Sequence, residues 1–370
     1  MSVQVSMNQV RFDCRHFRGD IPCKPNKTND QVCPTCTAYE PISKRILMIK
    51  LGAIGDVIRT TPLIQKFREV HPGCHITWLT LTPEAVPASR VDKIYKLDFK
   101  SVYNLSHLKF DIAINLDKDV EACALLADVW AVEKYGYILR DGHVDVANHL
   151  ADHKFLTGMF DNLSKVNRKN YLEEIFEICG FSFNKEPYVL ELNPSLDAMW
   201  DDLRARANGR KIIGLNTGCG DRWLTRLWPT PYWVDLITRL TNDGFFPVLL
   251  GGPAEDAGNR ELQSLTGAYY PGTFTLPQFF SLTNQCDVIV TAVSMMMHIA
   301  IALRIPQVLF VNIFNPYEFE LYDRGVIVQP DSGCDCYFGN TCKRDQHCMN
   351  DLPVEKVYQA VHQMLAVKKG

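Results

Sequence analysis

A short turn near residue 50 carries residue types that suit anion binding and proton transfer. The apolar run at 46–49 leads into the turn Leu51-Gly52-Ala53-Ile54-Gly55-Asp56, and helical spacing follows. Gly52 and Gly55 let the backbone approach an anion closely, and a helix start offers free N–H groups and a positive dipole end. The same dipole keeps Asp56 ionised, which suits a general base that takes a proton from a hydroxyl. The alternative is that Asp56 only caps the helix.

A second glycine-rich loop has the composition of a diphosphate site. The loop follows an apolar strand, and two arginines come close behind it. The candidate residues are Thr217, Gly218, Cys219, Gly220, Arg222 and Arg226. Backbone N–H groups and guanidinium groups at the carboxyl end of a parallel strand are what a diphosphate requires. An ordinary connection with two solvated arginines is the alternative.

Two later segments repeat this strand-and-loop arrangement. LLGGPAEDAGNREL, at 249–262, contains Glu255, whose carboxylate can accept a hydrogen bond from a ribose or a base. A plain surface loop explains that segment equally well. VTAVSMMMHIAIAL, at 290–303, places Ser294, Met297 and His298 at the start of an apolar helix. A lone histidine on such a helix is commonly a buried core residue, and that alternative stays open.

Thirteen cysteines are the unusual feature of the composition, and eight of them form two clusters near the ends of the chain. Each cluster supplies four thiolates, enough for one tetrahedral zinc ion or an iron site, whereas free thiols or redox disulfides are the alternative. The chain shows no secretion signal, so we expect a structural metal ion at one or both clusters rather than disulfides. The clusters are Cys14, Cys23, Cys33 and Cys36, and Cys334, Cys336, Cys342 and Cys348.

One further pattern resembles a metal site but is better explained otherwise. Asp117-Lys118-Asp119 follows an apolar strand and has the D-x-D spacing that binds metal–nucleotide complexes in some transferases. A polar loop is the favoured interpretation of these residues.

The composition limits the class of protein. The 370 residues are 46% hydrophobic and 22% charged, with a formal net charge of -3, which excludes a disordered chain, a collagen or a coiled coil. No basic excess is available to bind a nucleic-acid backbone. The most apolar stretch, 288–303, contains Thr291, Ser294 and His298 and fits a strand and a buried helix better than a membrane span. We therefore expect a cytoplasmic protein that is not an integral membrane protein.

Strands and helices alternate twice along the chain, which predicts two doubly wound α/β domains. Strands are expected at 46–49, 75–80 and 110–116, helical segments at 143–163 and 170–181, and a lapse of the strand pattern at 187–210. The strand-and-helix pattern restarts at Lys211, and an amphipathic helix is expected near 353–366. We predict a Cys-rich segment at 1–42, one Rossmann-like domain at 43–195 and a second at 196–370, facing a central cleft.

Taken together, these blocks resemble glycosyltransferase family 9, the heptosyltransferase family, which has the GT-B fold. The resemblance spans roughly 44–366 and is most specific in ILMIKLGAIGDVIRTTPL; GLNTGCGDRWLTRLWP and LLGGPAED also resemble family blocks. It implies that Asp56 is the catalytic base and that Arg226 contacts the donor diphosphate. It also implies that Ser294, Met297 and His298 line the donor phosphates.

The resemblance further implies a reaction: a heptose or related sugar moves from an ADP-activated donor to a hydroxyl, with inversion and without a catalytic metal. The acceptor is a lipopolysaccharide-core sugar or a protein side chain, and a homo-oligomer is compatible with the sequence. No obvious basic or apolar run marks a membrane-facing patch, which favours a soluble acceptor.

One departure from the family pattern supports a second hypothesis. Family members usually have Asp-Thr or Asp-Ser five and four residues before the histidine, and this chain has Val293 and Ser294. One polar donor contact is therefore missing. The alternative hypothesis is a non-catalytic relative that binds a nucleotide sugar and carries metal- or redox-linked cysteine clusters.

Overall fold

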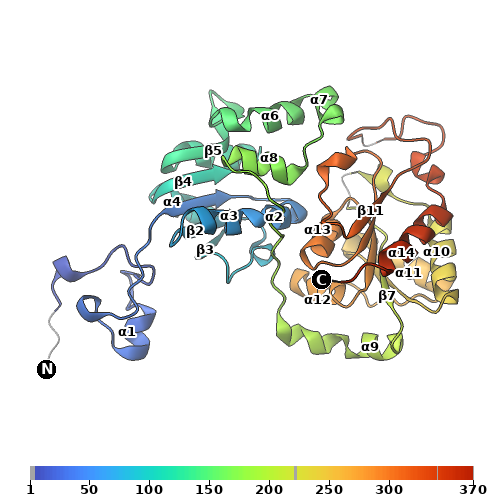
Figure 1. The fold of residues 1–370 in the computed structure, drawn as a ribbon, viewed down its shortest axis with the longest axis horizontal. Helices are drawn as coiled ribbons and strands as arrows, with labels where there is room; N and C mark the ends of the chain where they lie inside the picture. Colours follow the sequence, from blue (N-terminus) through green and yellow to red (C-terminus); the bar gives the residue numbers. More distant parts are fainter. Residues whose placement is uncertain (1–4, 221–222, 340, 370) are drawn as a thin grey trace. The chain divides into compact units, whose positions relative to one another are not determined.

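The computed structural model describes residues 5–220, 223–339 and 341–369 (Figure 1). The contacts divide these residues into two compact units. The first unit comprises 5–50, 63–81 and 88–148, and the second comprises 51–62, 82–87 and 149–369. The segment that carries Asp56 therefore groups with the C-terminal half of the chain, although it directly follows the first strand.

The first unit is built on a six-stranded sheet whose strands are parallel except for the last. Its strand order is β3-β2-β1-β4-β5-β6, and only the β5–β6 pair is antiparallel. The bounds are β1 (Arg45–Ile49), β2 (His75–Thr80), β3 (Lys93–Lys96), β4 (Lys109–Asn115), β5 (Trp130–Arg140) and β6 (His143–Val146). β1 lies at the centre of the sheet and, apart from its first residue, is buried, as its continuous apolar run predicts.

Helices α3 (Pro62–Val70), α4 (Phe99–Ser106) and α5 (Val120–Asp128) belong almost entirely to this unit. The single helical segment that the sequence suggests after Asp56 is divided in two. Helix α2 (Ile54–Thr60) ends at Thr61, and α3 begins at Pro62, whose ring and missing N–H cannot continue a helix.

The N-terminal segment has little regular structure. From residue 5 on it contains one α-helix, α1 (Lys24–Asn29), two single-turn 3-10 helices and an antiparallel bridge between Cys14 and Pro41. The Arg15 guanidinium pairs with Asp92 and donates to the carbonyls of Gly73 and Cys74, both at 2.9 Å. Among residues 5–45, only Pro25 is buried, so the segment has no apolar core of its own.

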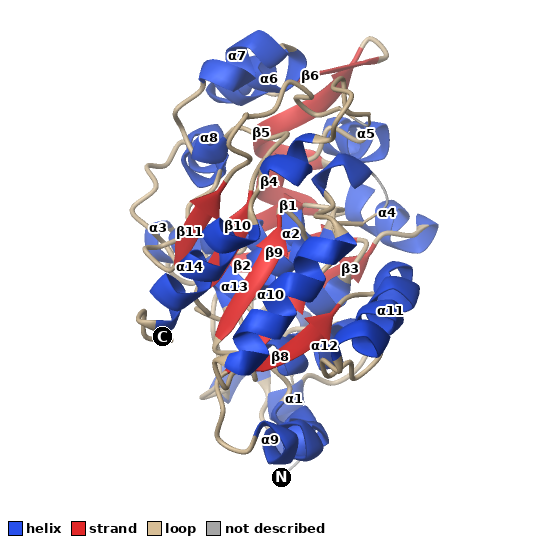
Figure 2. Ribbon diagram, turned by 90° about the vertical axis from the view of Figure 1, so that its right-hand side faces the viewer, coloured by secondary structure: helices blue, strands red, loops and turns tan. Residues whose placement is uncertain are grey.

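The second unit contains a five-stranded parallel sheet with helices on both faces. Its strand order is β11-β10-β9-β7-β8. The bounds are β7 (Ile212–Asn216), β8 (Phe246–Leu250), β9 (Val288–Ala292), β10 (Gln307–Phe310) and β11 (Gly325–Val328). Helices α10 (Thr230–Asn242), α11 (Asp256–Thr266) and α14 (Val354–Leu365) lie on one side, and α12 (Leu276–Thr283) and α13 (Met295–Ala302) on the other. Figure 2 shows the strands of this sheet behind α10.

Four further helices belong to the second unit: α6 (Asp152–Met159), α7 (Asp161–Val166), α8 (Tyr171–Ile178) and α9 (Asp201–Ala207). The start of α8 is fixed by a capping box, in which Asn170 and Glu173 exchange side-chain and backbone hydrogen bonds. The prediction of helix at 143–163 is wrong for 143–146, which form strand β6. The turn at Asp141-Gly142, where both residues have positive φ, folds β6 back on β5.

The predicted doubly wound architecture is confirmed for both halves, and all the predicted strands are present. Strands β3, β5, β6 and β11 were not predicted. No helix among the described residues is long and apolar enough to cross a membrane. The segment 288–303 divides, as expected, into strand β9 and helix α13.

Gly136 in β5 provides a test of the first sheet. Its φ is +88°, and an added Cβ would lie 1.8 Å from the carbonyl oxygen of Asn115. Gly136→Ala should lower the free energy of unfolding by about 3 kcal/mol, because left-handed strain and a backbone clash combine.

Gly142→Ala is the matched control, because Gly142 also has positive φ (+80°) but nothing lies within 4 Å of its added Cβ. It should cost only about 1 kcal/mol. Urea unfolding of both variants measures the difference. Equal losses in the two variants would contradict the described packing of β5 against β4.

Candidate active site

Asp56 is held against helix α13 by a close approach of two helices within the second unit. Gly55 is buried, and a Cβ added to it would lie 2.5 Å from Cδ2 of His298 and 3.3 Å from Cα of Met295. Any larger residue at this position would push α2 away from α13. The glycine therefore has a packing function in the structure, and a role of Gly52 and Gly55 in binding an anion stays a prediction.

The Asp56 carboxylate belongs to an ion-pair network centred on Arg59. Nε of Arg59 lies 2.9 Å from Oδ1 of Asp56, and Nη1 lies 3.0 Å from Oε1 of Glu318. The Arg59 guanidinium also lies 3.3 Å from the ring centroid of Tyr171. Burial opposes the charge of this guanidinium, but its acidic neighbours outweigh burial and raise its pKa above the ordinary value. The Asp56 side chain is one-third exposed, at 33%, so a substrate hydroxyl can reach it.

His298 is neutral in this environment. Its side chain is buried and stacks on Tyr188, with ring centroids 6.1 Å apart. Burial, followed by the nearby charge of Arg59, lowers the pKa of His298 to about 3, against a smaller opposing effect of Asp56. Within the described part of the chain, Nδ1 of His298 has no hydrogen-bond partner. A buried ring nitrogen without a partner is available to a ligand.

The loops that follow β7 and β8 contact one another closely. The Thr217 hydroxyl donates to Oδ1 of Asn259 at 2.6 Å. A Cβ added to Gly218 would lie 2.1 Å from Cγ of Glu255, so only glycine allows this carboxylate so near. Oε2 of Glu255 accepts from the backbone N–H of Gly252 at 2.8 Å. Glu255 is therefore positioned by backbone contacts and is not a freely moving surface carboxylate.

Asn216, at the end of β7, links this loop to the segment before α13. Its amide nitrogen donates to the carbonyl of Gly218 at 2.9 Å and to the hydroxyl of Thr291 at 3.1 Å. The Thr291 and Ser294 hydroxyls are themselves 3.1 Å apart. Ser294 is the N-cap residue of α13, and Met297 is fully buried within that helix. The structure therefore brings Thr217, Gly218 and Ser294 to one edge of the second sheet.

Arg226 is a buried cation that the described residues do not neutralise. Arg226 is 6% exposed, and its guanidinium donates to the backbone carbonyls of Val293, Cys219 and Trp223. Burial lowers the pKa of the Arg226 guanidinium below its ordinary value, but arginine remains protonated at neutral pH. No carboxylate among residues 5–220, 223–339 and 341–369 pairs with it. A desolvated positive charge of this kind favours a bound anion.

The remaining candidates are less informative. Gly220 has a φ of +73° and open space around its Cα, which fits a turn. Arg222 lies outside the described residues. Asp117 belongs to the first unit, where it is buried and forms an ion pair with Lys50. The predicted polar loop is present between β4 and α5, but Asp117 is buried in it.

Several residues of this region were not predicted to take part. Arg59, Tyr171, Tyr188, Asn216 and Glu318 are scattered over the sequence, and only the fold places them beside the predicted residues. For Arg59 the signal was the i,i+3 spacing from Asp56, which allows an ion pair on one helix face.

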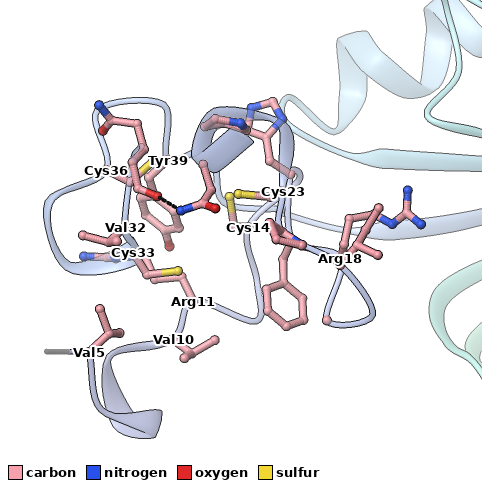
Figure 3. Close-up of a pocket in the computed structure, with 18 residues that line it drawn as sticks. Val5, Val10, Arg11, Cys14, Arg18, Cys23, Val32, Cys33, Cys36 and Tyr39 are labelled. Carbon is pink, nitrogen blue, oxygen red and sulfur yellow. Dashed lines mark hydrogen bonds between the residues drawn. The ribbon is translucent and has the colours of Figure 1, made fainter. Parts of the chain in front are cut away.

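The first cysteine cluster lines a single cavity of about 330 Å³ in the N-terminal segment (Figure 3). All four of its cysteines, Cys14, Cys23, Cys33 and Cys36, are free thiols, and Figure 3 shows the thiols of Cys14 and Cys23 directed toward one another. His16 also lines the cavity.

The second cysteine cluster packs against the second sheet. Cys348 is buried in the core, and its thiolate is favoured because Cys334 donates a hydrogen bond to it, which lowers the pKa of Cys348 and raises that of Cys334. The backbone N–H of Lys343 also donates to Cys336 Sγ at 3.1 Å.

In the described parts of the chain, no three His, Cys, Asp or Glu side chains converge closely enough to hold a metal ion. The predicted metal sites at Cys14, Cys23, Cys33 and Cys36 and at Cys334, Cys336, Cys342 and Cys348 are therefore not supported as formed sites. The physical reason is that the thiols of the first cluster surround a cavity instead of meeting at one point.

Comparison with known proteins identifies the family. The model of glycosyltransferase family 9 (heptosyltransferase) matches residues 99–343, which is more than half of the chain but excludes the turn before Asp56. No curated protein sequence matches the chain.

Solved structures of similar fold cover most of the chain. A family 9 glycosyltransferase from Veillonella parvula is 18% identical, with a TM-score of 0.64, and the match covers 88% of this chain and 98% of that one. ADP-heptose LPS heptosyltransferase II from E. coli is 16% identical, with a TM-score of 0.65 and coverages of 87% and 98%. The iron-containing dodecameric glycosyltransferase TibC from enterotoxigenic E. coli is 13% identical, with a TM-score of 0.55 and coverages of 87% and 76%.

At these identities the solved structures establish the fold alone, and they confirm the predicted GT-B architecture. The family model establishes the class of enzyme. The chain belongs to glycosyltransferase family 9, the heptosyltransferase family, and is a glycosyltransferase.

Proposed function

We propose that the protein transfers a heptose or a closely related sugar from an ADP-activated donor to an acceptor hydroxyl, with inversion at the anomeric carbon. The single observation that carries the donor assignment is Arg226, a buried cation without a carboxylate partner in the described chain. It lies on the loop after β7, beside Thr217, Gly218 and Gly220. A diphosphate supplies the negative charge that this position lacks.

The two flanking loops are suited to the other parts of the donor. Glu255, fixed against Gly218, is positioned to accept hydrogen bonds from a ribose or a base. Ser294 and the start of α13 offer a hydroxyl and backbone N–H groups to the phosphates. Nδ1 of the neutral His298 can donate to a donor oxygen without adding a charge that would repel Arg59.

Asp56 is the proposed general base. In a single displacement, the acceptor hydroxyl loses its proton to Asp56 while its oxygen forms a bond to the anomeric carbon, and the bond to the diphosphate breaks. The developing charge on the diphosphate is stabilised by Arg226 and the loop N–H groups. Arg59 orients the carboxylate through the 2.9 Å contact, and Glu318 and Tyr171 hold Arg59 in place. No step requires a metal ion.

Two similar proteins support the ADP-heptose assignment. One fold relative is named an ADP-heptose LPS heptosyltransferase, and another is TibC in complex with ADP-D-beta-D-heptose. We propose a lipopolysaccharide-core sugar or a protein side chain as the acceptor.

A second candidate function is non-catalytic binding of a nucleotide sugar, and Val293 is the observation that favours it. In place of the acidic side chain expected there, Val293 offers its backbone carbonyl to Arg226 and buries its side chain. The same observation also suits catalysis, because a carboxylate at 293 would partly neutralise Arg226.

Asp56→Asn separates these two functions. The amide keeps the shape of the carboxylate but cannot take a proton, so transfer should fall by about a hundredfold or more. Binding of ADP should be unchanged, because Asp56 has no part in the diphosphate site. Transfer from ADP-heptose is measured by ADP release, and ADP binding by calorimetry.

Wild-type protein that binds ADP without any turnover would favour the non-catalytic function. Full transfer by Asp56→Asn would remove Asp56 from the mechanism.

Arg226→Gln tests the diphosphate site. Loss of a desolvated charge that contacts an anion costs about 2–5 kcal/mol, so ADP should bind at least about thirtyfold more weakly. Adenosine lacks the diphosphate, and its affinity should not change; calorimetry with both ligands measures the difference. Glu255→Gln is the matched control, which should affect adenosine and ADP equally. Unchanged ADP affinity in Arg226→Gln would contradict the assignment.

We further propose that the four N-terminal cysteines bind one structural zinc or iron ion. They line one cavity, and the segment buries only Pro25, so it lacks the core that would otherwise hold it together. The four thiols line this cavity and must come closer together to become ligands of one ion. The second cluster has less need of a metal ion, because Cys348, Met349 and Leu352 already belong to the hydrophobic core.

Elemental analysis of the purified protein should find about one zinc or iron ion per chain. The double variant Cys33→Ser/Cys36→Ser should lose that ion, with ADP affinity unchanged. The matched double variant Cys334→Ser/Cys342→Ser should retain it. Metal-free wild-type protein, or loss of the ion only in the second variant, would contradict the proposal.

A further inference from the structure

A small cavity lies in the second unit, near the amino ends of β10 and β11. It has a volume of about 30 Å³, and Arg304, Gln307 and Arg324 contribute to its lining. Gln307 is the first residue of β10, and Arg324 directly precedes β11. Because the strands of this sheet are parallel, the loops that follow β7 and β8 leave from the opposite ends of the strands. The cavity is therefore not part of the loops proposed to bind the donor.

Gln307 brings an unsatisfied polar group to this cavity. The residue is 1% exposed, and its Oε1 has no hydrogen-bond partner among the described residues. Its backbone N–H belongs to the sheet and donates to the carbonyl of Arg324 at 2.9 Å. A buried amide oxygen is costly to leave without a donor. A ligand that carries an O–H group into the cavity removes this cost.

Two arginines without carboxylate partners line the same cavity. Neither Arg304 nor Arg324 forms an ion pair within residues 5–220, 223–339 and 341–369. The neighbouring carboxylates have other partners: Asp323 pairs with Lys185 at 3.5 Å, and Oε1 of Glu320 accepts a backbone N–H at 2.7 Å. No carboxylate of the described chain lines the cavity. The cavity therefore has two positive charges at its wall and no negative charge.

The backbone of Arg304 adds a second reason to assign a use to this side chain. Arg304 directly follows Leu303, the C-cap residue of α13, and its φ is +55°. Glycine is usual in this left-handed conformation at the end of a helix, because other side chains are strained there. The end of α11 follows that rule with Gly267, whose φ is +74°. Arg304 is exposed, so solvent and small ions can reach its guanidinium.

The size and the chemistry of the cavity limit the ligand. Sites for cofactors and drug-sized molecules have volumes of roughly 300 Å³ or more, whereas about 30 Å³ admits a few water-sized atoms. Two guanidinium groups favour a small dianion with several oxygens, because they donate paired, charge-assisted hydrogen bonds. Gln307 requires that the same ligand also donates a hydrogen bond. Hydrogen phosphate, with two negative charges and one P–O–H group, meets both requirements.

We propose that this cavity is a binding site for hydrogen phosphate. Arg304 and Arg324 contact its charged oxygens, and Oε1 of Gln307 accepts a hydrogen bond from its P–O–H group. Tyr188 also lines the cavity and stacks on His298, with ring centroids 6.1 Å apart. The bound ion therefore lies one ring away from His298 without contacting the loops after β7 and β8. The proposal does not depend on the transferase function.

Calorimetric titration of the full-length protein with inorganic phosphate tests the proposal, at slightly alkaline pH, where hydrogen phosphate predominates. The protein should bind phosphate, and sulfate at least about tenfold more weakly, because sulfate has the same charge but no proton for Gln307. Gln307→Met, which keeps the size of the side chain, should remove the preference for phosphate over sulfate. Arg304→Gln/Arg324→Gln should weaken the binding of both ions by about a hundredfold.

Arg206→Gln is the matched control, because Arg206 of α9 is exposed, pairs with Asp202 at 2.7 Å and does not line the cavity. It should bind phosphate like the wild type. Thermal unfolding checks that each variant is folded. Arg304 is exposed and Arg324 is half-buried, so the arginine variant tests the site even if Gln307→Met unfolds.

Arg226→Gln distinguishes this cavity from the proposed diphosphate site. It should bind phosphate normally, because Arg226 does not line the cavity. Absence of phosphate binding, equal affinities for phosphate and sulfate, or loss of phosphate binding in Arg226→Gln would overturn the proposal. Unchanged ADP affinity in Arg226→Gln, together with normal phosphate binding, would contradict the donor site alone.

Discussion

The contact between helices α2 and α13 is the constraint on which the candidate site depends. Gly55 has no side chain, so His298 can pack directly against the helix that carries Asp56 and Arg59. The same contact buries His298 and Arg59 together, which keeps the histidine neutral and the guanidinium paired with carboxylates. Asp56, Arg59 and the ring of His298 are therefore positioned by one missing methyl group.

The charges of Arg59 and Arg226, both in the second unit, are balanced in different ways. Arg59 forms ion pairs with Asp56 and Glu318 and stacks on Tyr171. Arg226 directs its N–H groups to carbonyls, and no carboxylate of the described residues pairs with it. This difference is the reason why we propose Arg226, and not Arg59, as the cation that contacts the donor.

The sequence predicts most of the fold because buried parallel strands are short apolar runs ended by glycine or polar residues. It predicts β1, β2 and β7 well, but β5 is buried only at Gly136 and Tyr137 and β3 is only four residues long, so neither shows a clear pattern. In the site, residues near recognisable loops, such as Asp56 and Arg226, could be predicted. Glu318 and Tyr188 could not, because their relation to Asp56 exists only after folding. The first cysteine cluster shows a different failure of prediction. Its spacing predicted a metal site, but the spacing of cysteines along the chain does not specify where their side chains point.

The arrangement of loops at the edge of the second sheet has an evolutionary consequence. Arg226 is anchored through the backbone of the loop after β7 and the residue before Ser294, whereas Glu255 is anchored in the loop after β8. The two anchors meet at the contact of Gly218 with Glu255 and at the hydrogen bond of Thr217 to Asn259. If the proposed donor site is correct, mutations after β8 can alter which nucleoside is preferred while the contacts of Arg226 stay unchanged.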